Sequence, residues 1–164
     1  METFFCRRAG EIEREREKLE KKLKVKIRIQ GRKVTFEGPA LEEYEANMVF
    51  EAFNFGFPLD SALMLKDEDM IFKRLNIKDF TRRVDLETVK SRLIGTQGRT
   101  RRTLENITDC HIRIQDNEVG IIGSAAEVEY TITAITNLIR GSKQANVYRF
   151  LERINTQKKT REEK

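Results

Sequence analysis

The chain repeats itself at a fixed spacing. Ile27-Arg28-Ile29-Gln30 recurs as Ile112-Arg113-Ile114-Gln115, 85 positions later. The same spacing, without a gap, pairs further identical residues along both halves. These pairs are Glu2-Thr3 with Glu87-Thr88, Arg7 with Arg92, Gly10 with Gly95, Arg14 with Arg99, Leu19-Glu20 with Leu104-Glu105, Val34 with Val119, Gly38 with Gly123 and Gly56 with Gly141. Because one spacing relates the two halves, we conclude that two copies of one module stand in tandem.

The first copy mixes helical and strand patterns. Residues 2–9 and 13–22 read as helices, while residues 25–29 alternate between polar and apolar side chains and predict a strand. A turn at residues 30–32 leads to a returning strand at 34–36. Pro39 then opens a helix that reaches Gly56. The apolar face of this helix is expected to hold Leu41, Tyr44, Met48 and Phe55.

The pattern of the second copy predicts a leading strand at residues 71–80, followed by the same elements as in the first copy. They are helices at 85–93 and 99–108, strands at 110–116 and 118–123, and a long helix at 125–140. The counterpart of the leading strand would fall before Met1, so we expect the first module to lack it. The fold class is therefore α+β, with two small antiparallel sheets packed against helices.

These patterns divide the chain into four parts. Residues 1–56 and 71–141 are the two modules, and residues 57–70 form an acidic connector with a short helix from Asp60. Residues 142–164 carry apolar side chains at helical spacing and are expected to dock as a C-terminal helix. The basic end of this segment, with Lys158, Lys159, Arg161 and Lys164, is expected to be disordered.

A glycine-bracketed loop, Gly95-Thr96-Gln97-Gly98, separates two predicted helices of the second copy. Two glycines three residues apart allow a tight turn and let backbone N–H groups approach a ligand closely. The helix that follows directs its positive end at the same place, which favours a phosphate. Residues 88–104 hold five basic side chains and no acidic one: Lys90, Arg92, Arg99, Arg101 and Arg102. We interpret the loop as a clamp for an RNA backbone.

The side chains around the loop divide between the core and a nucleic acid. Leu104 and Ile107 take the inner face of the second helix, so Arg101 and Arg102 are expected to point outward. The predicted RNA-binding residues are Ile94, Gly95, Thr96, Gln97, Gly98, Arg92, Arg99, Arg101, Arg102 and Ile112. Ile112 is a candidate for the apolar floor under a base, although core packing is the favoured interpretation for it.

The two copies differ at this loop. The first copy has Gly10-Glu11-Ile12-Glu13, in which the second glycine is replaced by glutamate. Residues 3–19 hold five basic and four acidic side chains, a net charge of +1 against +5 for residues 88–104. Because neutralised phosphates supply most non-specific affinity for a polyanion, the second module is the predicted RNA-binding one.

Other kinds of chemistry have weak support in the sequence. Cys6, Cys110 and the single histidine, His111, follow no metal-binding spacing, and no nucleophile lies beside a base. We therefore expect no metal, no cofactor and no enzymatic activity. No apolar run approaches the roughly 20 residues that span a bilayer, so no membrane contact and a cytoplasmic location are expected.

The second half resembles a known family. Gly98–Thr108, Ile121–Ser124, Ala134–Gly141 and Asn146–Tyr148 resemble the KH protein that assembles the small ribosomal subunit in archaea and eukaryotes. The resemblance implies two type I KH modules, the first degenerate, and a clamp for about four nucleotides at Gly95–Gly98. It also implies binding near the 3′ end of small-subunit ribosomal RNA, a partner endonuclease that trims that end or other assembly factors, and no catalysis. Where the family's loop usually holds lysine and glycine, this chain has Thr96-Gln97.

Two alternatives remain open from the sequence. The first is a protein-interaction scaffold built from two KH folds, for which RNA contact is incidental. The second is a nuclease or RNA-modifying enzyme, which the sparse catalytic chemistry disfavours.

Overall fold

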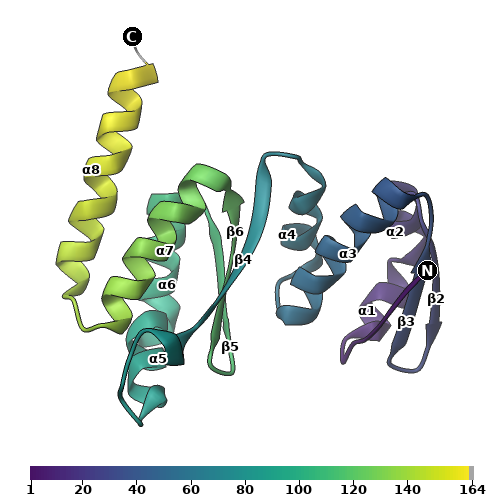
Figure 1. Ribbon diagram of the computed structural model, residues 1–164, viewed down its shortest axis with the longest axis horizontal. Helices are drawn as coiled ribbons and strands as arrows, with labels where there is room; N and C mark the ends of the chain where they lie inside the picture. The colour runs from purple at the N-terminus through teal and green to yellow at the C-terminus, as the bar shows by residue number, and fades with distance from the viewer. Residues whose placement is uncertain (163–164) are drawn as a thin grey trace. The chain divides into compact units, whose positions relative to one another are not determined.

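A computed structural model describes residues 1–162, which form two compact units (Figure 1). The first unit is Met1–Glu68 and the second begins at Asp69. Each unit contains one three-stranded antiparallel sheet, with strand order β1-β3-β2 in the first and β4-β6-β5 in the second. Helices pack against each sheet, so the predicted α+β fold class is confirmed.

The first unit folds around aromatic side chains. Phe36, on the central strand of the sheet, packs against Phe50 of a helix with 5.0 Å between ring centroids. Phe53 and Phe57 are also fully buried. Its elements are β1 (Glu2–Phe5), α1 (Ala9–Arg14), α2 (Arg16–Leu23), β2 (Lys26–Gln30), β3 (Lys33–Glu37), α3 (Ala40–Phe55), α4 (Leu59–Leu63) and the 3-10 helix η1 (Met64–Lys66).

The first module has its leading strand, contrary to expectation. Residues 2–5 form β1 and pair with β3, whereas a helix was predicted over residues 2–9. Threonine and phenylalanine favour strands. The ring of Phe4 also lies 5.2 Å from that of Phe50 and 6.2 Å from that of Phe36. Packing against this core therefore determines the conformation of the segment.

The strand register shows where the first module is shorter. Glu2 and Lys73 hold equivalent places, opposite Phe36 and Ile121, and they are 71 positions apart. Ile27 and Ile112 are also equivalent, opposite the same two residues, and they are 85 positions apart. Offsets of 71 and 85 differ by 14 residues. The first module therefore lacks about one helix between its leading strand and the helix that precedes its hairpin.

Beyond that deletion the repeat is confirmed in detail. Lys24 and Asp109, 85 residues apart, both end a helix in the left-handed conformation, with φ of 56° and 60°. A Cβ on Gly38 would lie 2.9 Å from Val25 Cγ1, and one on Gly123 would lie 2.5 Å from Cys110 Sγ. Val25 and Cys110 are themselves 85 residues apart. In both units, a glycine near the end of the central strand thus closely approaches the residue that precedes the neighbouring strand.

Helix α3 buries only part of the face that was predicted: Phe55 is buried and Met48 is half-buried. Ala46, Val49, Phe50, Ala52, Phe53 and Phe55 are its buried residues. Leu41 and Tyr44, which were expected to face the core, are 63% and 64% exposed. The first turn of α3 lies beyond the core of its unit, so the apolar character of these two side chains misled the sequence interpretation.

The second unit adds two helices to the same plan. Asp85 accepts a hydrogen bond from the Thr88 N–H at the start of α5, and Ser124 accepts one from Glu127 at the start of α7. Strand β4 ends at Asn76, where a 3-10 turn replaces the predicted continuation to residue 80. The elements are β4 (Met70–Asn76), η2 (Ile77–Asp79), α5 (Leu86–Ile94), η3 (Thr96–Gly98), α6 (Arg99–Thr108), β5 (His111–Gln115), β6 (Glu118–Ser124), α7 (Ala125–Ile139) and α8 (Gln144–Glu162).

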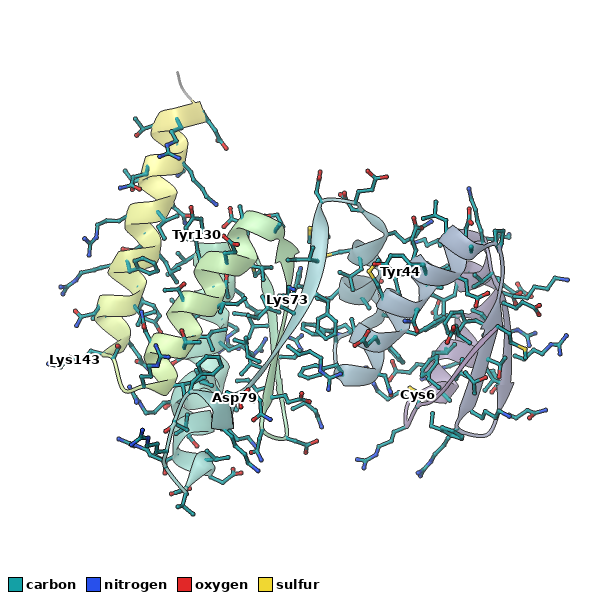
Figure 2. The ribbon with its side chains drawn as sticks, viewed as in Figure 1. Cys6, Tyr44, Lys73, Asp79, Tyr130 and Lys143 are labelled. Carbon is teal, nitrogen blue, oxygen red and sulfur yellow. The ribbon has the colours of Figure 1, made fainter. Side chains whose placement is uncertain are left out.

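The C-terminal segment is helical as far as it is described. Lys158, Lys159 and Arg161 belong to α8, so their predicted disorder is wrong, and Lys164 lies outside the described residues. Val147 and Leu151 bury one face of α8, and the Asn155 side chain donates a 2.7 Å hydrogen bond to the Ile107 carbonyl. Lys158 pairs with Glu127 beside the Tyr130 ring (Figure 2). None of the described helices has the length and apolar character that a membrane span requires.

Candidate nucleic-acid interface

The glycine loop has a backbone that few residues other than glycine adopt. Gly95 ends α5 with φ of +75°, Gln97 follows at +55° and Gly98 at +74°. A Cβ on Gly95 would lie 2.2 Å from Thr100 Oγ1 and 2.7 Å from the Thr100 nitrogen. The loop is therefore folded back on the first turn of α6, and Gly95 is required by both conformation and space.

Gly98 has a different role. A Cβ at Gly98 would meet only the Arg101 Nη2 atom, at 3.7 Å, so the space beside it is open. Gly98 is the N-cap of α6 and, having no side chain, leaves the amide groups of the first turn without a side-chain cap. Uncapped amides at the positive end of a helix favour an anion.

The basic side chains around the loop fall into two groups. Arg99 and Arg102 are exposed on α6, whereas Arg92 and Arg101 are only partly exposed. Arg92 donates a 2.9 Å hydrogen bond to the Ser142 carbonyl, at the connection between α7 and α8. Of these four arginines, only Arg99 and Arg102 are as exposed to solvent as the sequence analysis predicted.

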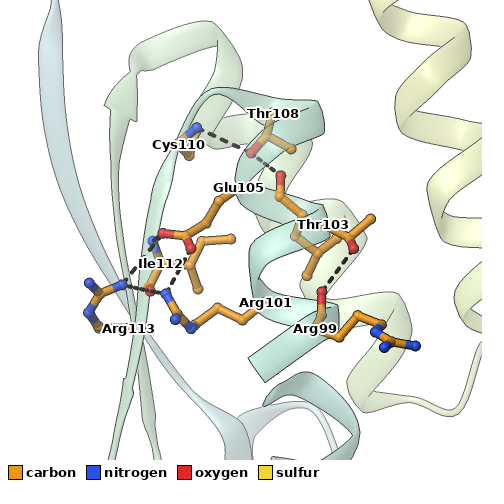
Figure 3. A network of polar contacts seen from close by, with 9 residues as sticks. Arg99, Arg101, Thr103, Glu105, Thr108, Cys110, Ile112 and Arg113 are labelled. Atoms are coloured by element: carbon orange, nitrogen blue, oxygen red, sulfur yellow. Dashed lines mark hydrogen bonds and ion pairs between the residues drawn. The ribbon is translucent and has the colours of Figure 1, made fainter. Parts of the chain in front are cut away.

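Arg101 faces β5, not solvent. Its Nη1 atom lies 2.7 Å from Glu105 Oε1, and Glu105 Oε2 accepts a 3.0 Å hydrogen bond from the Ile112 N–H (Figure 3). Arg113 lies 3.5 Å from the same carboxylate and donates a 2.8 Å hydrogen bond to the Ile112 carbonyl. Burial, with the neighbouring positive charge of Arg101, lowers the pKa of Arg113. Arg101 is therefore held along β5 and only partly exposed, so it does not point freely outward as predicted.

This network covers an open sheet edge. Strand β5 lies at the edge of its sheet, where the backbone groups that face away from β6 have no strand partner. Glu105, Arg101 and Arg113 provide partners for Ile112 instead. The Ile112 side chain is 2% exposed and belongs to the core, which was the favoured interpretation.

The sequence interpretation missed the support of the loop by the start of α8. Gln144 Nε2 donates a 3.0 Å hydrogen bond to Thr100 Oγ1, the atom that abuts Gly95. Together with the Arg92 to Ser142 bond, this contact holds both ends of the loop against the chain between α7 and α8. Lys143, in that connection, is an exposed cation (Figure 2). The contacting residues are 44 and 50 positions apart, so the local sequence carries no signal of these contacts.

The corresponding stretch of the first unit is not a loop. Gly10 to Glu13 lie inside helix α1, and the Ile12 side chain is fully buried. Arg8 is also occupied: its guanidinium lies 3.9 Å from the centroid of the Phe53 ring and donates to the Phe57 carbonyl. No surface comparable to the glycine loop exists at this place.

The second unit, which carries the glycine loop, is also the more basic of the two. Residues 1–68 carry 13 basic and 14 acidic side chains, and residues 69–164 carry 19 and 13. The net charges are therefore −1 and +6. Among the described residues, no group of three His, Cys, Asp or Glu side chains could hold a metal ion.

The fold and the glycine loop define the second unit as a type I KH module, with the order strand, helix, glycine loop, helix, two strands, helix. Residues 71–156, more than half of the chain, match the model for the second KH module of PNO1, a eukaryotic type KH domain of type I. The chain belongs to the KH family that includes PNO1 and Dim2p, which confirms the resemblance seen in its sequence.

Relatives and solved structures agree with this assignment. The chain is 30% identical over 142 residues to a KH domain-containing protein of Methanocaldococcus jannaschii and 35% identical over 135 residues to the RNA-binding protein pno1 of Drosophila pseudoobscura. These matches cover 82% and 77% of the chain, which spans 63% and 57% of the two relatives.

Two structures from Pyrococcus horikoshii share the fold over nearly the whole chain. Dim2p matches with a TM-score of 0.80 at 28% identity, covering 93% of this chain and 98% of Dim2p. A chain in a complex of a/eIF2alpha, Dim2p and rRNA matches with a TM-score of 0.82 at 28% identity, covering 95% of this chain and 94% of the other.

Proposed function

We propose that this protein is an RNA-binding assembly factor of the small ribosomal subunit and that its second KH module holds single-stranded RNA at Gly95–Gly98. The observation that carries the proposal is the loop itself: open space beside Gly98, uncapped amides at the start of α6, and exposed Arg99 and Arg102. The first unit offers a regular helix turn with a buried Ile12 at the corresponding place. The names of relatives, an RNA-binding protein and a complex with rRNA, support the same class of ligand.

The finer parts of the proposal follow from the family. The RNA is the region near the 3′ end of small-subunit ribosomal RNA, and the partner proteins are the endonuclease that trims this end or other assembly factors. The protein acts in the cytoplasm and has no catalytic activity of its own. Crosslinking in lysate followed by sequencing of bound RNA should enrich the 3′ end of that RNA, and purified protein with Mg²⁺ should leave RNA intact.

Replacing Gly98 by aspartate should weaken RNA binding about 30-fold, because a carboxylate would face the phosphates. The open space at Gly98 lets the variant fold. Filter binding of single-stranded RNA to Gly98→Asp and wild type measures the effect. The matched control is Gly10→Asp, at an exposed helix position of the first unit with no atom within 4 Å of the new Cβ. Equal affinity of wild type and Gly98→Asp would favour the scaffold alternative.

Arg99 and Arg102 should contribute through phosphate contacts alone. Replacing both by alanine should weaken binding of all RNA sequences alike and reduce the slope of log affinity against log salt by about 1 to 2. A salt series from low to physiological ionic strength measures this slope. Arg149→Ala/Arg153→Ala, which removes two exposed arginines of α8, is the matched control. If the control reduced the salt slope as much as Arg99→Ala/Arg102→Ala, the phosphates would not be bound specifically by Arg99 and Arg102.

A further inference from the structure

The first unit separates its charges along the chain. Residues 1–39 carry twelve basic and seven acidic side chains, whereas residues 40–68 carry one basic and seven acidic ones. The single cation of the second stretch, Lys66, donates to the Lys22 carbonyl. The seven acids are Glu42, Glu43, Glu45, Glu51, Asp60, Asp67 and Glu68. Helix α3 and the segment after it therefore form an acidic part of the unit, with a net charge of −6.

An apolar stripe runs along α3 on the side opposite its buried face. Leu41, Tyr44 and Met48 follow one another at spacings of three and four residues, which places them on one side of a helix. Leu41 and Tyr44 are 63% and 64% exposed, and Met48 is half-buried. Figure 2 labels Tyr44 on α3. Adjacent exposed leucine and tyrosine on one helix face favour a contact with a partner.

The same stripe is covered farther along the helix. Phe55, the next apolar residue on it, is 6% exposed, and its ring stacks on that of Phe57 with 5.9 Å between centroids. Helix α4 and η1 pack on this end of α3. The chain thus covers one half of the stripe with its own apolar segment and leaves the half around Tyr44 bare.

The acidic surroundings select the kind of partner. Glu45 follows Leu41 by four residues and precedes Met48 by three, so it flanks the stripe, and α3 has no basic residue. Carboxylates repel the phosphates of RNA, and they repel the equally acidic α3 of a second copy. A segment that presents leucine-like side chains between lysines or arginines can pack on the apolar stripe and pair with the acidic side chains around it.

We propose that the α3 face, formed by Leu41, Tyr44, Met48 and Glu45, docks a basic amphipathic segment of a protein partner. This binding site is separate from the proposed RNA clamp, and neither depends on the other. Apolar contact with Leu41 and Tyr44 supplies affinity, and the Glu45 carboxylate orients the basic edge of the partner.

A synthetic peptide of about 18 residues, with leucines at helical spacing and lysines elsewhere, is the probe for this face. Its fluorescence anisotropy is measured against the full chain, with a peptide of the same composition in scrambled order for comparison. Leu41→Ser/Tyr44→Ser should weaken binding of the ordered peptide at least about tenfold. Phe5→Ser, which removes another exposed aromatic side chain of the unit, should leave it unchanged.

Glu45→Lys provides a second variant that keeps the apolar stripe. This variant should bind the ordered peptide more weakly than wild type. The remaining affinity should also depend less on salt, because an attractive charge pair has been lost. All variants should keep the unfolding transition and the RNA affinity of wild type.

Three results would overturn the proposal. They are equal binding of the ordered and scrambled peptides, peptide affinity unaffected by Leu41→Ser/Tyr44→Ser, and loss of RNA affinity in that variant, which would make the face an RNA surface. Dimerisation of wild type that the double substitution abolishes would instead identify a second copy as the occupant, and it also contradicts the proposal.

Discussion

Alanine at Gly95 should destabilise the second unit by about 2–6 kcal/mol. Two costs add. The backbone of Gly95, with φ of +75° and ψ of 173°, is in a region that essentially only glycine adopts and disfavours any residue with a Cβ by about 1–3 kcal/mol, and forcing a methyl group into filled space costs about 1–3 kcal/mol. The space is filled because the new Cβ would lie 2.2 Å from Thr100 Oγ1 and 2.7 Å from the Thr100 nitrogen. Neither the helix backbone nor a side chain held by Gln144 can move aside easily.

Two further glycines provide controls for Gly95→Ala. Gly98 is in the left-handed α conformation, with φ of +74°, and has open space beside it, so Gly98→Ala should show a backbone cost of about 1 kcal/mol without a steric one. Gly10 lies inside helix α1 with open space, so Gly10→Ala should be neutral or stabilise the first unit by up to about 1 kcal/mol. Because the chain has two units, amide hydrogen exchange in β3 and β6 is the suitable measurement. Equal protection of β6 in Gly95→Ala and Gly98→Ala would contradict the steric argument.

Much of the fold was accessible from the sequence because the repeat carries local signals. The alternation of residues 25–29 and 110–116 predicts both hairpins, and α6 has the bounds that its amphipathic pattern indicated. The leading strand β1 was missed for a physical reason. Four residues are too few to show a period, and a gap-free spacing conceals the 14-residue deletion that follows them.

The candidate site was only partly predictable. The glycines of the loop and the exposed position of Arg102 follow from local chemistry, since they depend on φ angles and on the period of one helix. The partners of Arg92 and Arg101 depend on how α6 meets β5 and on where the chain turns after α7. Arg101 and Glu105 are four residues apart and were visible as a helix pair, but their contact with Ile112 required the tertiary fold.

The network around Glu105 leads to the second large expected effect. Replacing Glu105 by alanine should destabilise the second unit by about 2–3 kcal/mol, because it leaves the Ile112 N–H without its acceptor and two partly buried guanidinium groups without their carboxylate. The two positive charges, already close enough that Arg101 lowers the pKa of Arg113, would then repel each other directly. Glu105→Gln, which keeps an acceptor but loses the charge, should cost about half as much.

The repeat supplies a matched control for this prediction at the equivalent place in the first unit. Glu20 pairs with Arg16 as Glu105 pairs with Arg101, but at 3.6 Å and with the two side chains 49% (Arg16) and 33% (Glu20) exposed. Such a surface pair is worth about 0.5 kcal/mol or less, so Glu20→Ala should barely change the unfolding of its unit. Exchange of the Ile112 amide measures the difference, because Glu105→Ala removes its acceptor at an open sheet edge. An Ile112 amide that stays as protected in Glu105→Ala as in wild type would mean that water satisfies this edge and that the carboxylate does not hold α6 to β5.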